Sequence, residues 1–168
     1  FAGVCRGEGA ALRERIEHHA WDGDWYRRAW FDDGTVLGSA QGAECRIDSI
    51  SQSWSVLAGV ADEARSRRAM QAVDAHLVRR AEGLVQLLDP PFDGARLDGA
   101  SLDPGYIRGY VPGVRENGGQ YTHGAIWAAM AFAAPGDGER AWELLRMINP
   151  ANHAHPLQAI DLYKAAPS

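Results

Sequence analysis

The spacing of apolar residues changes several times along the chain, and each change marks an expected element. In five segments apolar residues recur every three or four positions, which is the spacing of one helix face. The five segments are residues 9–21, 47–58, 62–82, 122–134 and 138–148. Ile50, Trp54 and Leu57 share this face in the second segment, and the fourth segment, apolar on nearly every side, is expected in the core. Asp137 is expected to cap the fifth.

Two stretches between these segments alternate in the manner of strands. Residues 25–31 change side-chain character at each position and lead into Asp33-Gly34, a pair that favours a tight hairpin turn. Residues 35–38 are then the returning strand, and residues 83–88 are a further candidate strand. The sequence therefore predicts one small β-hairpin inserted among helices.

Helices in pairs, joined by loops and carrying one small hairpin, define an all-α fold class. Such an arrangement favours a layered α/α array or a toroid. The 168 residues suffice for one core and hardly for two, so we expect residues 1–168 to form a single domain. The segment from Pro90 to Gly113 contains five Gly and four Pro and is expected to be mostly loop. A loop of that length inside a compact domain often carries function.

Composition excludes several classes of function. With 46% hydrophobic and 23% charged residues, the chain has the composition of an ordinary soluble globular protein. A formal charge of −5 gives no general attraction for nucleic acid or for an anionic membrane surface, so no nucleic-acid partner is expected. Cys5 and Cys45 lack a metal-binding or redox spacing and favour a reducing compartment. Motifs of nucleotide-binding loops and of serine hydrolases are absent from the sequence.

The corner WDGDWYRR is the first candidate site. Asp22 and Asp24 lie two residues apart, with Trp21 and Trp25 beside them. Indole rings stack on the apolar faces of pyranose rings, and carboxylates accept hydrogen bonds from sugar hydroxyls. Desolvation among aromatic rings favours the protonated form of a carboxyl group, which a general acid requires. The alternative, favoured by pattern alone, is a turn with two core tryptophans.

The segment PGVRENGGQYTHGAIW, residues 112–127, is the second candidate site. Its glycines allow tight bends that would gather polar side chains into one small volume in front of an apolar helix. The polar side chains are those of Arg115, Glu116, Asn117, Gln120, Tyr121 and His123. A helix N-terminus with an adjacent His and Arg favours a bound anion such as phosphate. The alternative is a solvated loop whose histidine caps the helix.

A third polar patch, ECRIDSISQSW, covers residues 44–54. Its charged residues alternate, which suits an exposed ion pair of Arg46 with Glu44 or Asp48, worth about 0–1 kcal/mol. A structural role is favoured for this patch.

These patches together resemble one family. WDGDWYRRAWFDDGTVLGS, ECRIDSISQSWSVLAG, and PGVRENGGQYTHGAIWAAMAFA with GDGERAWELLRMINPANHA are similar, in this order, to glycoside hydrolase family 94, the inverting β-glucoside phosphorylases. The resemblance runs from about Glu8 to Tyr163, and it is greatest to the phosphorylase-like domains of cyclic β-1,2-glucan synthases. The family's catalytic domain is an (α/α)6 toroid, so the resemblance implies that this chain supplies only part of one.

The resemblance also implies a reaction. Inorganic phosphate, as co-substrate, attacks the anomeric carbon of a β-linked gluco-oligosaccharide, with β-1,2-glucan as the expected substrate. One carboxylic acid protonates the departing oxygen, and α-glucose 1-phosphate is released; the reverse synthesis follows the same path. The family's acid lies in a D-W-N-D segment without a counterpart here, so the acid is expected upstream of Phe1, with Asp22 as the fallback. The family's phosphate-binding arginines and C-terminal Thr-Gly also lack counterparts.

Carried over residue by residue, the resemblance assigns Glu116 to a sugar hydroxyl and His123 to phosphate. The remaining expected pocket residues are Arg115, Gln120 and Tyr121, with Trp21 or Trp25 as a stacking platform. No metal and no cofactor besides phosphate is expected.

Two other functions stay open. One is a hydrolase on the same toroid, with Glu116 as base, and the other is a non-catalytic carbohydrate-binding piece. Besides glucan and phosphate, the expected partners are the rest of a longer parent chain and further copies of this chain, because part of a toroid exposes apolar helix faces. The resemblance implies a cytoplasmic location, either free or as the cytoplasmic domain of a larger bacterial inner-membrane protein.

Overall fold

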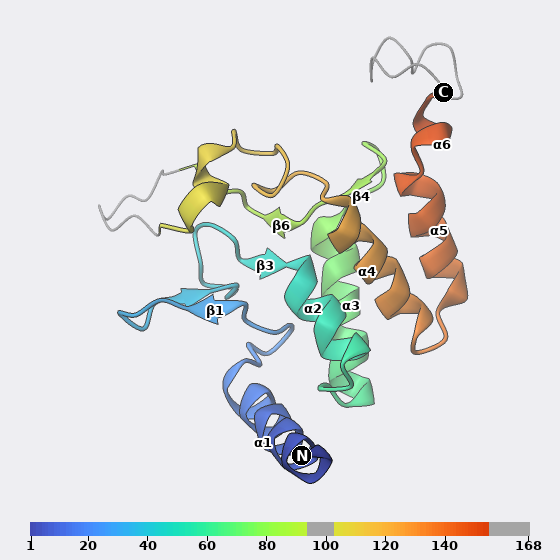
Figure 1. Ribbon diagram of the computed structural model, residues 1–168. Helices are drawn as coiled ribbons and strands as arrows, with labels where there is room; N and C mark the ends of the chain where they lie inside the picture. Colours follow the sequence, from blue (N-terminus) through green and yellow to red (C-terminus); the bar gives the residue numbers. More distant parts are fainter. Residues whose placement is uncertain (94–102, 155–168) are drawn as a thin grey trace.

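The computed structural model describes residues 1–93 and 103–154. The described part is mainly helical and includes three small antiparallel sheets of two strands each (Figure 1). The helices are α1 (Ala2–His19), α2 (Ser49–Leu57), α3 (Glu63–Leu77), α4 (Thr122–Ala133), α5 (Gly138–Ile148) and α6 (Pro150–Ala154), with a 3-10 helix, η1, at Gly105–Gly109. The strands are β1 (Ala29–Trp30), β2 (Val36–Leu37), β3 (Ile47–Asp48), β4 (Val78–Arg79), β5 (Leu84–Val85) and β6 (Leu88–Asp89).

Four of the helices form two helix pairs that pack side by side. In Figure 1, α2 and α4 descend while α3 and α5 return in the opposite direction. α2 and α4 lie against each other, α3 packs on α2, and α5 packs on α4. The prediction of paired helices with a small hairpin is therefore confirmed, and the complete (α/α)6 toroid stays a prediction.

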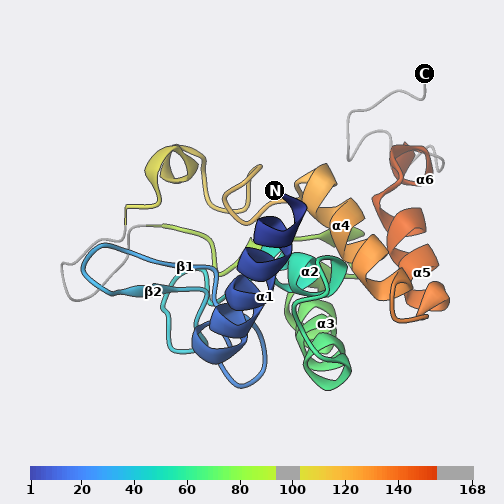
Figure 2. The same ribbon diagram turned by 60° about the horizontal axis from the view of Figure 1, so that its bottom comes forward.

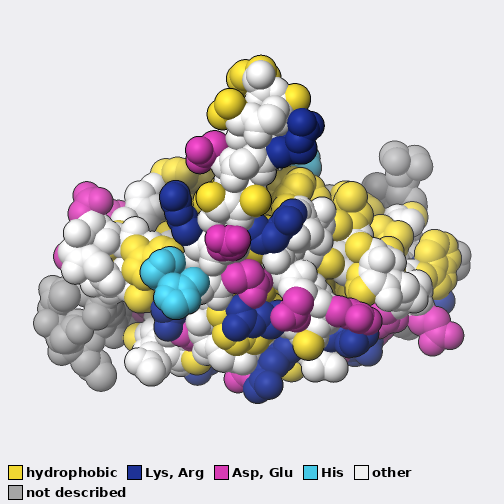
Figure 3. Space-filling view, turned by 90° about the horizontal axis from the view of Figure 1, so that it is seen from below, with side chains coloured by type: hydrophobic (Ala, Val, Ile, Leu, Met, Phe, Trp, Pro, Cys, Tyr) yellow, Lys and Arg dark blue, Asp and Glu magenta, His cyan; other side chains and the backbone are white. Residues whose placement is uncertain are grey.

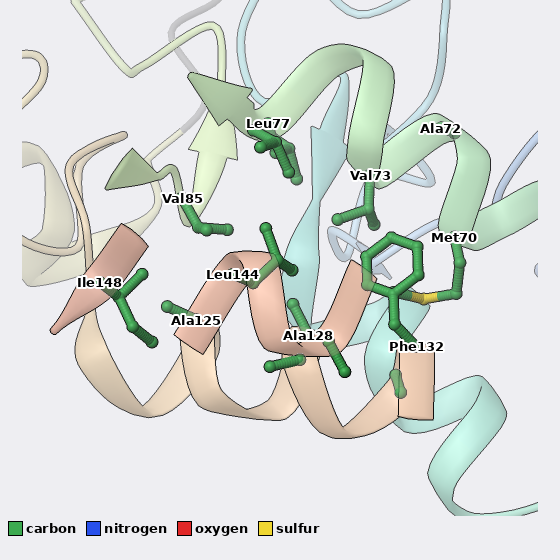
Figure 4. Packing of buried hydrophobic residues seen from close by; sticks show 14 of the residues in the cluster. Met70, Ala72, Val73, Leu77, Val85, Ala125, Ala128, Phe132, Leu144 and Ile148 are labelled. Atoms are coloured by element: carbon green, nitrogen blue, oxygen red, sulfur yellow. The ribbon is translucent and has the colours of Figure 1, made fainter. Parts of the chain in front are cut away.

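The main core lies between these helix pairs (Figure 4). Met70, Val73 and Leu77 of α3 form one buried cluster with Phe132 of α4 and Leu144 of α5. The rest of the α4 contribution is mostly alanine, whose small side chain lets neighbouring helices approach closely. The expectation that residues 122–134 lie in the core is confirmed.

The side of α2 that faces inward differs from the side that its apolar residues predict. The buried residues of α2 are Ser49, Gln52, Ser53 and Ser55, whereas Trp54 is 45% exposed. The hydroxyls of Ser53 and Ser55 donate to carbonyls of the helix itself, so their burial leaves neither hydroxyl unpaired. Small side chains on this face allow α2 to lie close to α4, which explains the reversal.

The predicted hairpin forms with shorter strands than expected. β1 pairs antiparallel with β2, with Ala29 opposite Leu37. α3 ends at Leu77, short of the predicted end at Glu82, because β4 and β5 pair there as a second hairpin. The predicted strand over 83–88 is split between β5 and β6, and β6 pairs with β3 at the entrance to α2.

The caps of α2 and α5 are built by aspartates. The Asp137 carboxylate accepts a hydrogen bond from the Arg140 backbone N–H at 3.0 Å, which confirms the predicted cap of α5. Asp48 caps α2 in the same way, through the backbone N–H of Ser51 at 2.9 Å. The short helix α6 follows α5 directly and was not predicted from the sequence.

Helix α1 projects from the rest of the chain (Figures 1 and 2). It begins well before the predicted Gly9, and none of its residues is buried. Its contact lies near its C-terminal end, where Glu17 accepts a hydrogen bond from the Tyr26 hydroxyl and pairs with Arg65. Seen from below, apolar side chains lie beside the projecting helix and continue toward the side of α4 and α5 (Figure 3). Across the described residues, no helix has both the length and the apolar character needed to cross a bilayer.

Candidate functional site

The glycine-rich loop before α4 explains why two adjacent glycines are needed there. Gly118 has φ +81, and an added Cβ would lie 2.9 Å from Pro91 Cβ. An added Cβ on Gly119 would lie 2.7 Å from Arg115 N and 2.8 Å from the Gly113 carbonyl oxygen. Both contacts are with backbone atoms, which cannot move aside as a flexible side chain can. The loop is therefore folded tightly on itself, as predicted, and the first glycine also fits it against the segment after β6.

The expectation that all the polar side chains of this loop share one small volume is wrong for Asn117, and Gln120 is bonded at one end to another segment. Asn117 is fully buried, and its amide bonds the backbone of Phe92 and Tyr110. Gln120, expected to line a pocket, accepts a hydrogen bond from the Val85 N–H at 2.9 Å through Oε1 and so anchors the loop to β5. The Asn117 amide is bonded at both ends because an unpaired polar group costs free energy away from water.

Arg115 and Glu116 are placed differently from these amides. Arg115 has φ +50, a backbone region that non-glycine residues rarely adopt, and its side chain is 65% exposed. Its guanidinium lies over the Tyr110 ring, 5.0 Å from the centroid. The Glu116 side chain is only 15% exposed, and its Oε2 is buried without a hydrogen-bond partner among the described residues. Arg115 Nε lies 3.6 Å from that oxygen, beyond hydrogen-bond distance.

Directly after this loop, the N-terminus of α4 carries a row of rings. The centroids of Tyr121 and His123 are 5.4 Å apart, and those of His123 and Trp127 are 6.2 Å apart. The row continues to Trp54 of α2, whose ring centroid lies 5.5 Å from that of Trp127. His123 is exposed, and Tyr121, the residue before the helix, makes no side-chain cap; the alternative of a solvated loop whose histidine caps the helix stays a prediction. Backbone N–H groups at such a terminus favour an anion.

At the WDGDWYRR corner, Asp22 has a structural role. Its Oδ1 accepts a hydrogen bond from Arg27 Nε and its Oδ2 from the Ala40 N–H, both at 2.8 Å. The side chain is 8% exposed. Both carboxylate oxygens are therefore engaged by contacts within the fold, one with a side chain and one with the backbone. The corner therefore gives no support for Asp22 as the acid.

Of the two tryptophans considered as stacking platforms, Trp25 is ruled out by its burial. It is 7% exposed, and its indole N–H donates to the carbonyls of Gly38 and Arg46, each at 3.0 Å. Trp21 is half-buried, with the Tyr26 ring at 4.9 Å and the Arg65 guanidinium at 4.9 Å. The alternative reading of the corner, a turn with core aromatics, is thus correct for Trp25.

The third patch is structural, as favoured, but by other contacts than the expected ones. Asp48 is fully buried and pairs with Arg28 of the corner rather than with Arg46. The Gln52 amide accepts from the Tyr26 N–H at 2.7 Å and donates to the Tyr26 carbonyl at 2.9 Å. These contacts tie the corner to α2. The sequence offered one signal for them, the spacing of Asp48 and Gln52 by one helical turn at a helix start.

Two groups with raised pKa values do not serve as nucleophiles or bases. Burial raises the pKa of the Tyr26 phenol, and its hydrogen bond to the Glu17 carboxylate raises it further. Burial also raises the pKa of the Cys45 thiol, and the negative charge of Asp48 raises it further. Both groups therefore stay protonated at neutral pH.

The chain belongs to the glycosyl hydrolase 94 superfamily, whose catalytic-domain model matches residues 4–167. It is similar to the cyclic β-(1,2)-glucan synthase NdvB of Rhizobium meliloti, with 52% identity over 157 residues, which are 94% of this chain and 5% of that protein. Identity is 35% over 162 residues to the solabiose phosphorylase of Paenibacillus borealis, covering 91% of this chain and 20% of the relative. Identity is also 35% over 150 residues to the N,N'-diacetylchitobiose phosphorylase of Vibrio proteolyticus, covering 85% of this chain and 17% of the relative. The chain thus spans a fifth or less of the length of these relatives.

Proposed function

We propose that this chain is part of the catalytic domain of an inverting phosphorylase that acts on β-linked gluco-oligosaccharides. The observation that carries the proposal is the placement of Arg115 and Glu116 on a tight loop directly before the uncapped N-terminus of α4, which bears His123. Family membership supports it, because several similar proteins are named phosphorylases. The resemblance to a cyclic β-(1,2)-glucan synthase favours β-1,2-glucan as the saccharide.

In this proposal the helix terminus binds phosphate and the loop binds the saccharide. Phosphate binds at His123, where backbone N–H groups of α4 add positive potential. Glu116 accepts a hydrogen bond from a sugar hydroxyl through its carboxylate, which is 15% exposed and whose Oε2 has no hydrogen-bond partner in the described structure. Arg115 and Tyr121 border the same place, the first from the loop and the second beside the His123 ring.

The reaction needs no base, because phosphate is itself the nucleophile. A phosphate oxygen forms a bond to the anomeric carbon as the glycosidic C–O bond breaks, with inversion. A carboxylic acid delivers its proton to the departing oxygen. We propose that this acid is supplied from outside the described residues, because both carboxylate oxygens of Asp22 are engaged by contacts that hold the corner together.

The test is release of glucose 1-phosphate from β-1,2-glucan and from cellobiose, with and without phosphate, by the full-length protein. We expect product only with phosphate, and we expect His123→Ala to raise the KM for phosphate about tenfold or more, as loss of a charged or polar contact does. His18→Ala is the matched control, since His18 is also an exposed histidine near a helix end.

Other outcomes would select other functions. Product formed without phosphate would indicate a hydrolase, with Glu116 as the candidate base. Glucan binding without any product would indicate a binding module. Complete loss of turnover in a folded Asp22→Asn variant would restore Asp22 as the acid.

A further inference from the structure

Asn117 is placed unlike the two charged residues that precede it. Its side chain is fully buried, whereas that of Arg115 is 65% exposed. Its amide oxygen accepts from the Phe92 N–H at 2.7 Å. Its amide nitrogen donates to the carbonyls of Phe92 at 2.8 Å and Tyr110 at 2.9 Å. The amide is therefore committed to the backbone of two other segments and is not available to a ligand.

The main chain of Asn117 closes the same loop from within. Its N–H donates to the Val114 carbonyl at 3.0 Å, and its carbonyl accepts from the Gly113 N–H at 2.8 Å. Together with the amide bonds, these contacts fix the backbone at the residue directly after Glu116. The direction in which the Glu116 side chain leaves the backbone is set by the same peptide plane.

Glu116 depends on that backbone for its placement. Its Oε2 is buried, yet among the described residues no hydrogen bond to a side chain or backbone group holds it. Arg115 Nε, at 3.6 Å, is too distant to orient the carboxylate by a hydrogen bond. A carboxylate that must meet a sugar hydroxyl at about 3 Å tolerates an error of only about 0.5 Å.

We propose that Asn117 is a positioning residue, which fixes the Glu116 carboxylate for a saccharide hydroxyl by tying the loop, through its side-chain amide, to residues 92 and 110. It does not touch the saccharide itself. The inference rests on the proposed function, because it takes Glu116 as the residue that binds the sugar.

The experiment is a double-mutant cycle of Asn117→Ala and Glu116→Ala in the full-length protein, read as KM for each substrate. We expect Asn117→Ala to raise the KM for the β-glucan about tenfold, as a small misplacement of a binding group does, and to leave the KM for phosphate unchanged. In the Glu116→Ala background the same substitution should add less than about a twofold change, because both act on one interaction.

Gln52→Ala is the matched control. Gln52 is also a fully buried amide with three bonds to backbone: to the Tyr26 N–H at 2.7 Å and to the carbonyls of Tyr26 at 2.9 Å and Asp48 at 3.0 Å. Its loss should lower stability to a similar extent without a selective rise in the KM for glucan. If Asn117→Ala does not fold, Asn117→Ser removes the same bonds with a smaller change in volume and replaces it in the cycle.

The outcomes separate this inference from the proposed function. An equal rise in the KM for glucan with and without Glu116 would overturn the inference alone, as would loss of active protein with both KM values unchanged. If Glu116→Ala leaves the KM for glucan unchanged, the role of Glu116 and the inference fail together. If glucose 1-phosphate is never released, phosphorolysis fails, and the same cycle read as glucan affinity decides the inference; absence of glucan binding would overturn it too.

Discussion

The WDGDWYRR corner and the glycine-rich loop are both dense in polar side chains, but they use them differently. At the corner, Asp22 is paired with Arg27, and Asp48 with Arg28. In the loop, Asn117 is fully bonded whereas Glu116 keeps a buried oxygen without a hydrogen-bond partner among the described residues. Density of polar residues in a sequence therefore does not by itself mark a site. The two regions differ in how many of their polar atoms are left without a hydrogen-bond partner within the fold.

The largest effect is expected from a substitution that forces the loop open. Gly119→Ala would place a Cβ within 2.7–2.9 Å of backbone atoms of Arg115 and Gly113, so the loop must move. We expect a loss of about 2–4 kcal/mol in the free energy of unfolding, and about 100-fold in kcat/KM if the loop binds substrate. Urea denaturation measures the free energy of unfolding, and phosphorolysis assays measure kcat/KM.

Gly138→Ala is the control for that substitution. An added Cβ there meets nothing within 4 Å, and Gly138 is the first residue of α5. Its replacement should be neutral or slightly stabilising, because alanine is the better helix former. Unchanged activity in Gly119→Ala would show that the loop geometry is not needed, and the contrast between the two regions would lose its functional meaning.

The next effect concerns the corner, where polar groups are predicted to serve stability. Asp48→Asn should cost about 2–4 kcal/mol of unfolding free energy, because it leaves Arg28 without its buried partner while an acceptor for the α2 cap remains. Asp24→Asn removes a pair with Arg68 in which both side chains are more than half exposed, and should cost less than about 1 kcal/mol. Equal losses in urea denaturation would contradict this ranking.

The smallest effect is a dependence on pH at the same corner. Because the pKa of Tyr26 is raised in the fold, its protonated form stabilises the structure below about pH 10, the ordinary value, and that stability is lost as pH rises further. Tyr26→Phe should cost about 1 kcal/mol at neutral pH, through the lost hydrogen bond to Glu17. It should also reduce the alkaline loss, which denaturation series at pH 8 to 11 would measure; identical slopes for both proteins would refute the assignment.

The helices were predicted well from spacing because most of them bury one continuous apolar stripe. The C-terminal end of α3 and the inward face of α2 were not predicted correctly. Residues 78–85 pair as strands through tertiary context, and α2 buries Ser53 and Ser55, whose hydroxyls donate to carbonyls of the helix itself. Neither feature produces a periodic spacing of apolar residues, so neither can be predicted from that spacing.

The candidate site was predictable in part, and for a related reason. The glycines predicted a tight loop. The start of α4 lacks a side-chain cap because its N-cap residue, Tyr121, is not one of the residue types that cap helices. What spacing could not tell was which amides turn inward. Asn117 and Gln120 find partners in segments distant in sequence, near Phe92 and Val85, and only the fold brings those carbonyls and N–H groups within reach.

Helix α1 offers a last contrast with the core helices. It spans 18 residues, includes Gly3, Gly7 and Gly9, and buries none of its side chains. Each glycine in a helix interior costs roughly 0.5–1 kcal/mol relative to alanine, and a helix of this length is marginal in water without tertiary contacts. Beyond the turn held by Glu17, the order of α1 is therefore governed by a local helix–coil equilibrium, separate from the cooperative melting of the core. Any surface that packs on the helical form of α1 shifts that equilibrium toward the helix. The fraction of α1 that is helical therefore depends more on what packs against it than on its own sequence.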